Sequence, residues 1–299
     1  MLDFIVIGGG TAGLSAAVYA CRANRSALVI ERDSFGGQIV DSPRIENYPG
    51  ICDISGAQFA SDLFDQAEKA GAQFACETVI ALEKNEDGTI DVVTDAERRT
   101  ARAVVIAAGC EHRRLGVDGE NELIGAGVSY CALCDGAFFK DKTVAVVGGG
   151  NAAFTDALYL AGIAKFVYII HRRDEFRAEP TLIERAKQLN NVRIVTFAKV
   201  KRAVGESELC GLILDKNGKE EELPIDGLFV AIGQQPDNGA FGVELDNDGY
   251  IETDGECRTN VAGIYAAGDC RKKTVRQLTT AAADGAIAVS TALTDLFRS

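Results

Sequence analysis

The sequence predicts an α/β fold, because one order of elements occurs twice in its 299 residues. Each copy consists of a buried strand, a glycine-rich turn, a helix and a second strand. The first copy covers residues 2–31 and the second covers residues 143–171. This internal repeat predicts two Rossmann-like dinucleotide-binding units, which a chain of this length can accommodate as two domains.

The first copy has the sequence features of a dinucleotide site. Residues 2–7 form an apolar strand, a helix covers residues 14–23, and a second strand covers residues 27–30. Glycines between strand and helix allow a tight turn, a close approach of the backbone to a pyrophosphate, and close packing of helix on strand. The helix N-terminus supplies N–H groups for phosphate, and a carboxylate after the second strand can bind ribose hydroxyls. The predicted ligand-binding residues of this copy are Gly8, Gly10, Thr11, Ala12, Gly13 and Glu31.

The second copy predicts a different nucleotide. Its strands cover residues 143–147 and 166–170, and its helix extends to about residue 161. Its turn contains Gly148, Gly150, Asn151, Ala152 and Ala153, with alanine in the third glycine place. In place of an acid, its second strand is followed by His171, Arg172, Arg173 and, one turn later, Arg177. Arginines bind a 2′-phosphate through charge-assisted hydrogen bonds, so this copy predicts NADPH. The alternative is a solvated run of charges.

The segments between and after the copies complete the α/β pattern. Helices are predicted over residues 56–70, 181–190 and 277–296, and buried strands over 104–109 and 227–233. Residues 192–231 predict further strands, with a turn at Lys216-Asn217-Gly218. Residues 111–120 and 234–239 are polar and are interpreted as two linkers.

A pair of cysteines separated by two residues precedes the second copy. Cys131 and Cys134 are followed directly by Asp135. Such a pair is more often redox-active or metal-binding than structural in a reducing compartment. Zinc normally requires four ligands, and both histidines are distant in the sequence, so the redox interpretation is favoured. A buried Asp135 could donate a proton to a leaving thiolate, although it could also be a turn residue before Gly136.

The composition excludes several classes of function. A net charge of −13 disfavours general binding of nucleic acids, which requires a basic surface. The chain contains no apolar run of the ~20 residues that a membrane span needs. Residues 2–4 enter a strand directly, with no secretory signal before it, so we expect a cytoplasmic protein. The other seven of the nine cysteines are scattered and are expected to be small core residues.

Taken together, these motifs are similar to those of one family over almost the whole chain. The sequence resembles the low-molecular-weight, bacterial-type thioredoxin reductases, which are FAD-dependent pyridine nucleotide-disulfide oxidoreductases. The matching segments are residues 8–13, 36–38, 47–50, 131–136, 148–153, 171–178, 231–233, 263–269 and 276–277.

The resemblance implies a discontinuous FAD domain, residues 1–112 and 243–299, with an NADPH domain, residues 113–242, inserted into it and carrying the cysteine pair. It implies that Cys134 faces the flavin, that Cys131 attacks the disulfide of thioredoxin, and that the enzyme is a homodimer. Besides the residues of the first glycine turn and Glu31, the residues expected to bind FAD are Gly37, Gln38, Asn47, Gly109, Asp269, Arg276 and Gln277.

The sequence departs from the family pattern at four positions. Ala152 and Thr155 stand where relatives usually carry a hydroxyl residue and a glutamate, and Gln234 and Cys270 stand where many relatives have histidine and valine. The loss of the hydroxyl at Ala152 removes one contact to the NADPH phosphates. The alternatives are therefore the same flavin-dependent redox enzyme with a different acceptor or donor. The acceptor could be a glutaredoxin-like or peroxidase partner, the electron donor could be ferredoxin, or the enzyme could oxidise a small-molecule dithiol. From a different class, the chain could be a flavin-binding redox sensor.

Overall fold

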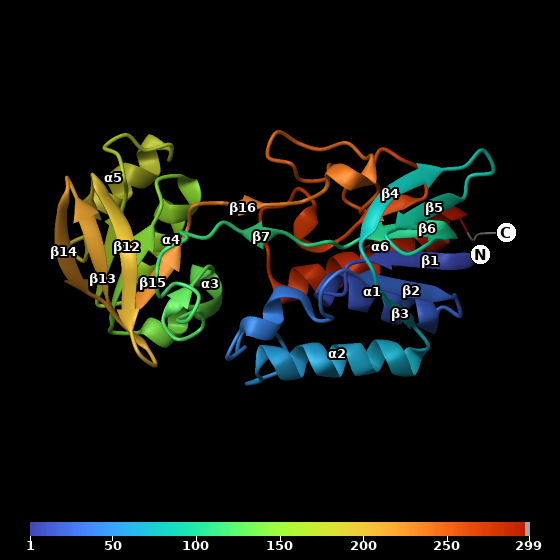
Figure 1. The fold of residues 1–299 in the computed structure, drawn as a ribbon, viewed down its shortest axis with the longest axis horizontal. Coiled ribbons are helices and arrows are strands. Elements are labelled where there is room, and N and C mark those ends of the chain that lie inside the picture. Colours follow the sequence, from blue (N-terminus) through green and yellow to red (C-terminus); the bar gives the residue numbers. More distant parts are fainter. Residues whose placement is uncertain (297–299) are drawn as a thin grey trace. The chain divides into compact units, whose positions relative to one another are not determined.

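A computed structural model describes residues 1–296 and divides the chain into two compact units. The first unit comprises Met1–Glu111 together with the chain from Gln235 onward, and the second comprises His112–Gln234. The blue and red ends of the chain in Figure 1 thus share one unit. The predicted second boundary, after residue 242, lies too late in the sequence, because Phe241 is buried in the core of the first unit.

A seven-stranded sheet forms the centre of the first unit, in the order β3-β2-β1-β6-β5-β4 with β17 beside β6. All of its pairs are parallel except β4–β5 and β5–β6, which form an antiparallel meander. The strands are β1 (Leu2–Ile7), β2 (Ala27–Glu31), β3 (Gln73–Cys76), β4 (Val79–Lys84), β5 (Ile90–Thr94), β6 (Arg98–Ile106) and β17 (Ile264–Ala266). The helices are α1 (Thr11–Arg22), α2 (Gly56–Ala70) and α6 (Leu278–Leu296), with 3₁₀ turns η1 (Gly37–Asp41), η3 (Gly239–Phe241) and η4 (Gly268–Cys270).

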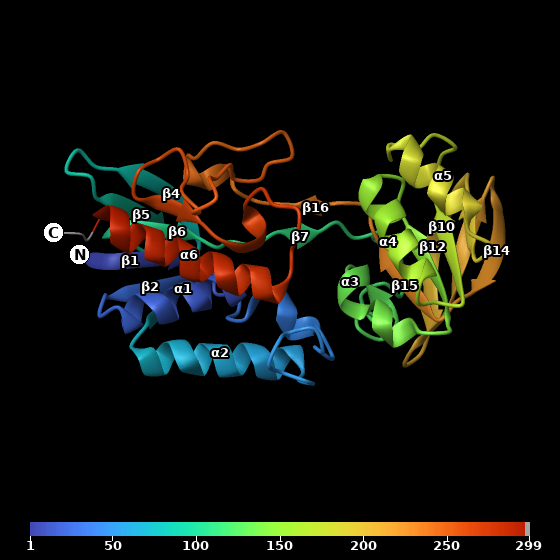
Figure 2. The same ribbon diagram turned by 180° about the vertical axis from the view of Figure 1, so that it is seen from behind.

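The apolar run of β1 reflects burial on both faces of this sheet. Phe4 and Val6 lie in the core that includes residues of α1 and α6, whereas Ile5 and Ile7 lie in a second core on the opposite face. Figure 2 shows α6 in front of the strands beside α1, against which it packs. Packing on both faces holds the parallel strands of the sheet in place. The glycine turn follows β1 directly, so its position is set by the end of this strand.

The second unit combines a parallel sheet with an antiparallel one. The parallel sheet has the order β11-β10-β9-β15-β8, and the antiparallel sheet has the order β12-β13-β14. The strands are β8 (Val128–Ser129), β9 (Thr143–Val147), β10 (Phe166–Ile170), β11 (Val192–Val195), β12 (Ala198–Gly205), β13 (Leu209–Lys216), β14 (Lys219–Pro224) and β15 (Gly227–Val230). The helices are α3 (Ala132–Asp135), α4 (Asn151–Ala161) and α5 (Pro180–Gln188), with the 3₁₀ turn η2 (Gly136–Phe139). Short strands β7 (Glu111–His112) and β16 (Gln234–Gln235) lie where the chain passes between the units.

The two-domain α/β architecture predicted from the repeat is confirmed, and most differences lie at the ends of elements. Helix α1 begins at Thr11, three residues before the predicted start, because the glycine turn leads directly into it. The predicted strand over 104–109 ends at Ile106, and Gly109 has a positive φ of 70° in the loop that follows. Helix α2 has the predicted bounds. Within residues 1–296, no helix has the length and apolar character needed to cross a membrane.

Candidate active site and dinucleotide sites

The first glycine turn has the geometry of a phosphate cradle. A Cβ at Gly8, which has a φ of +105°, would lie 2.2 Å from the Ala107 carbonyl oxygen, and one at Gly13 would lie 1.9 Å from the Gly8 oxygen. At Gly10 the nearest atoms to an added Cβ are 3.9 Å away, so this position is open for the approach of a ligand. Among the described residues, no side chain caps the N-terminus of α1. The first N–H groups of Thr11 and Ala12 are therefore oriented as a site for phosphate.

The carboxylate of Glu31 is held in place beside this turn. Its Oε2 accepts a hydrogen bond of 2.6 Å from the Gly9 N–H, and its Oε1 accepts one of 3.0 Å from the Asp33 N–H. A cavity of about 120 Å³ is lined by Gly8, Glu31 and Gly109, among others. The structure thus brings together three of the residues predicted to bind FAD, and the fixed carboxylate can accept hydrogen bonds from ribose hydroxyls.

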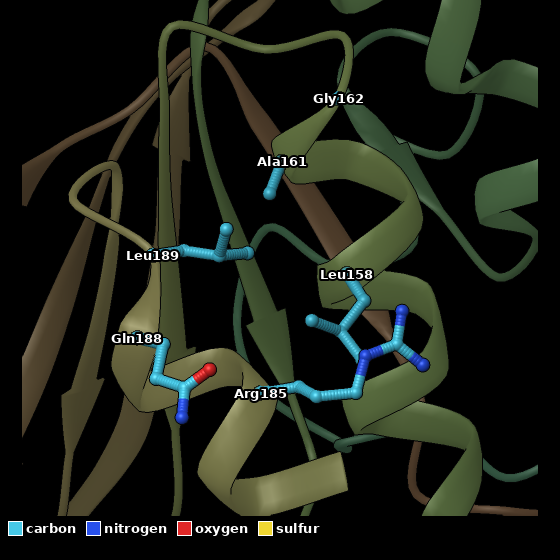
Figure 3. Close-up of a pocket in the computed structure, with 6 residues that line it drawn as sticks. All are labelled: Leu158, Ala161, Gly162, Arg185, Gln188 and Leu189. Carbon is cyan, nitrogen blue, oxygen red and sulfur yellow. The ribbon is translucent and has the colours of Figure 1, made fainter.

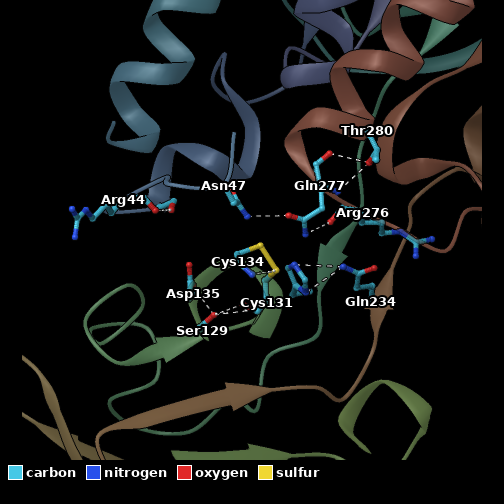
Figure 4. The surroundings of a disulfide bond; sticks show 12 residues. Arg44, Asn47, Ser129, Cys131, Cys134, Asp135, Gln234, Arg276, Gln277 and Thr280 are labelled. Atoms are coloured by element: carbon cyan, nitrogen blue, oxygen red, sulfur yellow. Dashed lines mark hydrogen bonds between the residues drawn. A yellow bond between two sulfur atoms is a disulfide. The ribbon is translucent and has the colours of Figure 1, made fainter. Parts of the chain in front are cut away.

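Most of the remaining predicted FAD residues line the loops at the same end of this unit. Gly37 lies against Gly10, since a Cβ at Gly37 would be 3.1 Å from the Gly10 Cα. The side chain of Gln38 donates to the Cys110 carbonyl oxygen. Asn47 Nδ2 donates to Gln277 Oε1 at 3.1 Å, which joins the loop after η1 to the start of α6 (Figure 4).

Asp269 and Arg276 lie at the turn that follows β17. Oδ1 of Asp269 is buried and has no hydrogen-bond partner among the described residues. Arg276 stacks on Tyr250 at 4.2 Å from the ring centroid, and its Nε donates to the Asp269 carbonyl oxygen at 3.5 Å. A buried acceptor without a partner is costly unless a ligand supplies a donor. The Asp269 carboxyl therefore fits the hydroxyl-bearing chain of FAD.

The second glycine turn, in the second unit, repeats this geometry with one open position. A Cβ at Gly148 would lie 2.4 Å from the Ala231 carbonyl oxygen, whereas one at Gly150 would meet no atom within 4 Å. No described side chain caps α4, and Ala152 is exposed in its first turn. The side chain of Asn151 is directed toward the start of α5, because its Oδ1 accepts a hydrogen bond of 2.8 Å from the Glu179 N–H.

The loop after β10 holds three arginines around a histidine. The side chains of Arg172, Arg173 and Arg177 are exposed and form no ion pair with any described residue. His171 packs on Gly149, where an added Cβ would lie 2.3 Å from its Cε1, and its Nε2 lies 3.2 Å from the Glu175 carbonyl oxygen. Burial lowers the pKa of His171, and the three guanidinium groups lower it further. An unpaired cluster of cations at this place fits the 2′-phosphate of NADPH.

The cysteine pair of the second unit forms a disulfide at the start of α3 (Figure 4). Cys131 and Cys134 are bonded to each other, with their Cα atoms 5.3 Å apart. The Cys134 N–H donates a hydrogen bond of 3.1 Å to the Cys131 sulfur. When the disulfide opens, this N–H would stabilise a thiolate at Cys131. Both cysteines are half-buried, and Leu133 between them is 51% exposed.

Asp135 lies beside the disulfide in a partly buried position. Burial raises the pKa of its carboxyl, and a hydrogen bond of 2.6 Å from Ser129 Oγ to Asp135 Oδ2 lowers it. Ser129 Oγ also accepts a 3.1 Å hydrogen bond from the Cys131 N–H, so this hydroxyl links the acid to the cysteine segment. Ser129 is not among the site residues predicted from the sequence. Its position two residues before Cys131 was the only signal in the sequence, because the contact depends on the turn.

The remaining cysteines are not arranged as a metal site. Within the described residues, no group of three or more His, Cys, Asp or Glu side chains could hold a metal ion. Cys110, Cys257 and Cys270 are buried, whereas Cys52, Cys76 and Cys210 are exposed, so the expectation of core positions is wrong for the last three. Burial raises the pKa of Cys257 to about 11, which leaves this thiol protonated and unreactive at neutral pH.

The second unit also contains a cavity away from the predicted site residues. It has a volume of about 330 Å³ and lies between the end of α4 and α5 (Figure 3). Its lining residues are Leu158, Ala161, Gly162, Arg185, Gln188 and Leu189. None of the residues predicted to bind a cofactor or to react lines it.

The chain matches proteins of known family over nearly its full length. Residues 2–285 match the family model described as pyridine nucleotide-disulphide oxidoreductase. The chain is 44% identical to the thioredoxin reductase of Treponema pallidum over 294 residues, which cover 97% of this chain and 95% of the relative. It is 43% identical to the thioredoxin reductase of Bacillus subtilis, covering 96% of this chain and 92% of that protein. The crystal structure of thioredoxin reductase from Streptococcus pyogenes is 39% identical, with a TM-score of 0.95 and coverage of 99% and 98%.

The fold, the paired nucleotide sites and these matches define the class of protein. The chain belongs to the pyridine nucleotide-disulphide oxidoreductase family and, within it, to the bacterial-type thioredoxin reductases. The resemblance seen in the sequence is thereby confirmed. Members of this family use FAD and NADPH, and the residues of the two cradles fit these groups.

Proposed function

We propose that this protein transfers electrons from NADPH, through FAD and the Cys131–Cys134 disulfide, to the disulfide of thioredoxin. One observation carries the proposal: within one unit, the Cys131–Cys134 disulfide lies beside the half-buried Asp135, which accepts a hydrogen bond from Ser129. The 44% identity to a thioredoxin reductase supports the choice of thioredoxin as acceptor. When bound, FAD supplies the two-electron chemistry that connects a nicotinamide to a disulfide.

The chain's own residues perform the exchange with the acceptor. The Cys131 thiolate attacks one sulfur of the partner disulfide, whose S–S bond breaks, and a mixed disulfide forms. Asp135 gives its proton to the leaving thiolate of the partner. Cys134 then gives its proton to the Asp135 carboxylate, and its thiolate attacks the Cys131 sulfur. The mixed S–S bond breaks, the Cys131–Cys134 disulfide is restored, and the second partner thiolate takes that proton from Asp135, so the partner leaves as a dithiol. Two electrons thus pass from this chain to the partner in each cycle.

The order of the two cysteines follows from their surroundings and from the family. The Cys134 N–H points at the Cys131 sulfur, so this donor stabilises the negative charge of a thiolate at Cys131. Cys134 is left to face the flavin and to resolve the mixed disulfide. The protein acts in the cytoplasm as a homodimer. Size-exclusion chromatography with light scattering would test the dimeric state.

The proposal is tested by anaerobic titration of the purified holoenzyme with NADPH, followed by thioredoxin from the same organism. We expect loss of the flavin absorbance on addition of NADPH and its return on addition of oxidised thioredoxin. Absence of the first change would favour another electron donor, such as ferredoxin. Loss of absorbance that thioredoxin does not reverse would favour another disulfide acceptor, such as a glutaredoxin-like protein or a small-molecule disulfide.

The arginines after β10 give a separate prediction about cofactor choice. Arg173→Ala should lower kcat/KM for NADPH by about ten- to a hundredfold, because it removes a charge-assisted contact to the 2′-phosphate. The kcat/KM for NADH, which lacks this phosphate, should change by less than about twofold. Arg185→Ala is the matched control, since Arg185 is also exposed in this unit but lies beside the cavity of Figure 3. Equal losses with both nucleotides would contradict the assignment.

A further inference from the structure

A buried cluster of charges lies beneath the turn that carries Asp269. Asp284, on the first half of α6, is 7% exposed. Its carboxylate accepts hydrogen bonds from Arg271 Nη1 at 3.1 Å and from Lys273 Nζ at 2.7 Å. It also accepts one of 3.0 Å from the Gly268 N–H. A single side chain thus joins α6 to the turn and to two cations.

The charges of this cluster do not cancel. The side chains of Arg271 and Lys273 are 13% and 10% exposed, so two nearly buried cations face one carboxylate. The Arg271 Nε is buried and has no partner among the described residues. Asp269 is the other acidic group nearby and Arg276 is a third cation beside it, so three cations face two carboxylates. Burying an excess of positive charge is costly, and a bound anion would offset that cost.

The cluster is packed directly against the start of α1. A Cβ at Gly268 would lie 2.8 Å from the Ala12 Cβ. Gly285, which follows Asp284, lies so close that an added Cβ would be 2.2 Å from the Ala12 carbonyl oxygen. Ala12 belongs to the uncapped first turn of α1, where the helix dipole already favours an anion. The turn at Gly268 and the residue that follows Asp284 are therefore both packed against the first turn of α1.

We propose that Arg271, Lys273 and Asp284 form a positioning cluster for the diphosphate of FAD. Asp284 holds the Gly268–Asp269 turn against α1, and the uncompensated cation adds positive potential at the site of the diphosphate. The inference rests on the assignment of FAD to the first unit. It concerns the binding of the cofactor and is independent of the identity of the acceptor.

Two adjacent lysines provide a matched pair of variants. Lys273 is nearly buried and bonded to Asp284, whereas Lys272 is 57% exposed and pairs with Glu252. Lys272→Met and Lys273→Met remove the same charge from neighbouring positions. The measurement is the equilibrium release of FAD from purified holoenzyme on dilution, followed by the rise in flavin fluorescence, at low and high salt.

We expect Lys273→Met to raise the dissociation constant of FAD by about tenfold and Lys272→Met to change it by less than about twofold. Because Lys273 is nearly buried, salt should reduce the effect of Lys273→Met only weakly. A purely structural role would lower the thermal unfolding midpoint without changing FAD release, which would overturn the proposal. Equal effects of the two substitutions on release would also overturn it.

Asp284→Asn provides a second test at the centre of the cluster. Asparagine keeps one oxygen acceptor but loses the charge that binds Arg271 and Lys273, so the Gly268–Asp269 turn is held less firmly. If holding this turn is the main role of Asp284, FAD release should increase by about tenfold, although the lost negative charge alone would favour the diphosphate. Asp295→Asn is its control on the same helix, because Asp295 bonds Arg258 at 2.7 Å, away from the turn. Unchanged release from the Asp284 variant would contradict the proposal. The measurement does not involve thioredoxin, so its failure is distinguishable from failure of the proposed reaction.

Discussion

Replacement of Cys131 by serine should lower the rate of thioredoxin reduction by about 10³-fold or more. The serine hydroxyl is not ionised at neutral pH and cannot form the mixed disulfide through which electrons leave the chain. Cys134→Ser should cause a similar loss of turnover, but it leaves the Cys131 thiol in place. This variant should therefore accumulate a mixed disulfide with thioredoxin, visible as a shifted band that dithiothreitol removes.

The exposed cysteine Cys210 supplies the control for these variants. It lies in the same unit, on β13, and is not part of the disulfide. Cys210→Ser should keep thioredoxin reduction within about twofold of the parent enzyme. Thioredoxin reduction by the protein that lacks both Cys131 and Cys134 would show that electrons take another route. A mixed disulfide formed by the Cys131 variant instead of the Cys134 variant would reverse the proposed order of the two thiols.

Much of the fold could be predicted because its signals are local in the sequence. The bounds of α2 were predictable, since Ser55 caps its N-terminus by accepting from the Gln58 N–H and Gly71 ends it with a φ of 102°. The two glycine turns were predictable because close contacts, such as that of Gly13 with Gly8, exclude any side chain. The second domain boundary was not predictable from the sequence, because the burial of Phe241 depends on a core assembled from distant segments.

Contacts between distant residues limit what the sequence predicts about the sites. The pairing of Asn47 with Gln277 joins positions far apart in the chain, and only the family resemblance placed both at the same cofactor. The run Arg271-Lys272-Lys273 has the composition of a solvated surface segment. The structure shows that Lys272 is exposed while Lys273 is bonded to Asp284, a difference that depends on how the turn packs against α6. Burial within a charged run therefore has to be observed in the structure.

Asp135→Asn is expected to slow the reduction of thioredoxin by about 10²- to 10³-fold and to change its pH dependence. Burial raises the pKa of Asp135, so part of this group is protonated at a pH where an exposed aspartate is ionised. As the pH rises through this raised pKa, Asp135 loses the proton that the leaving thiolate needs, and the rate should fall. Asparagine has no such proton, so the variant should lose this alkaline limb. Thioredoxin reduction followed by stopped flow across the pH range measures both effects.

Ser129→Ala tests the same assignment in the opposite direction. The hydrogen bond from Ser129 stabilises the ionised form of Asp135, so its removal should raise the pKa of the carboxyl further. The alkaline limb should then move to higher pH, while the maximal rate falls less than in the Asp135 variant. A structural role for Asp135 as a turn residue before Gly136 predicts loss of stability in Asp135→Asn without any shift of the limb in Ser129→Ala. A limb that stays in place in Ser129→Ala would therefore remove Asp135 from the role of proton donor.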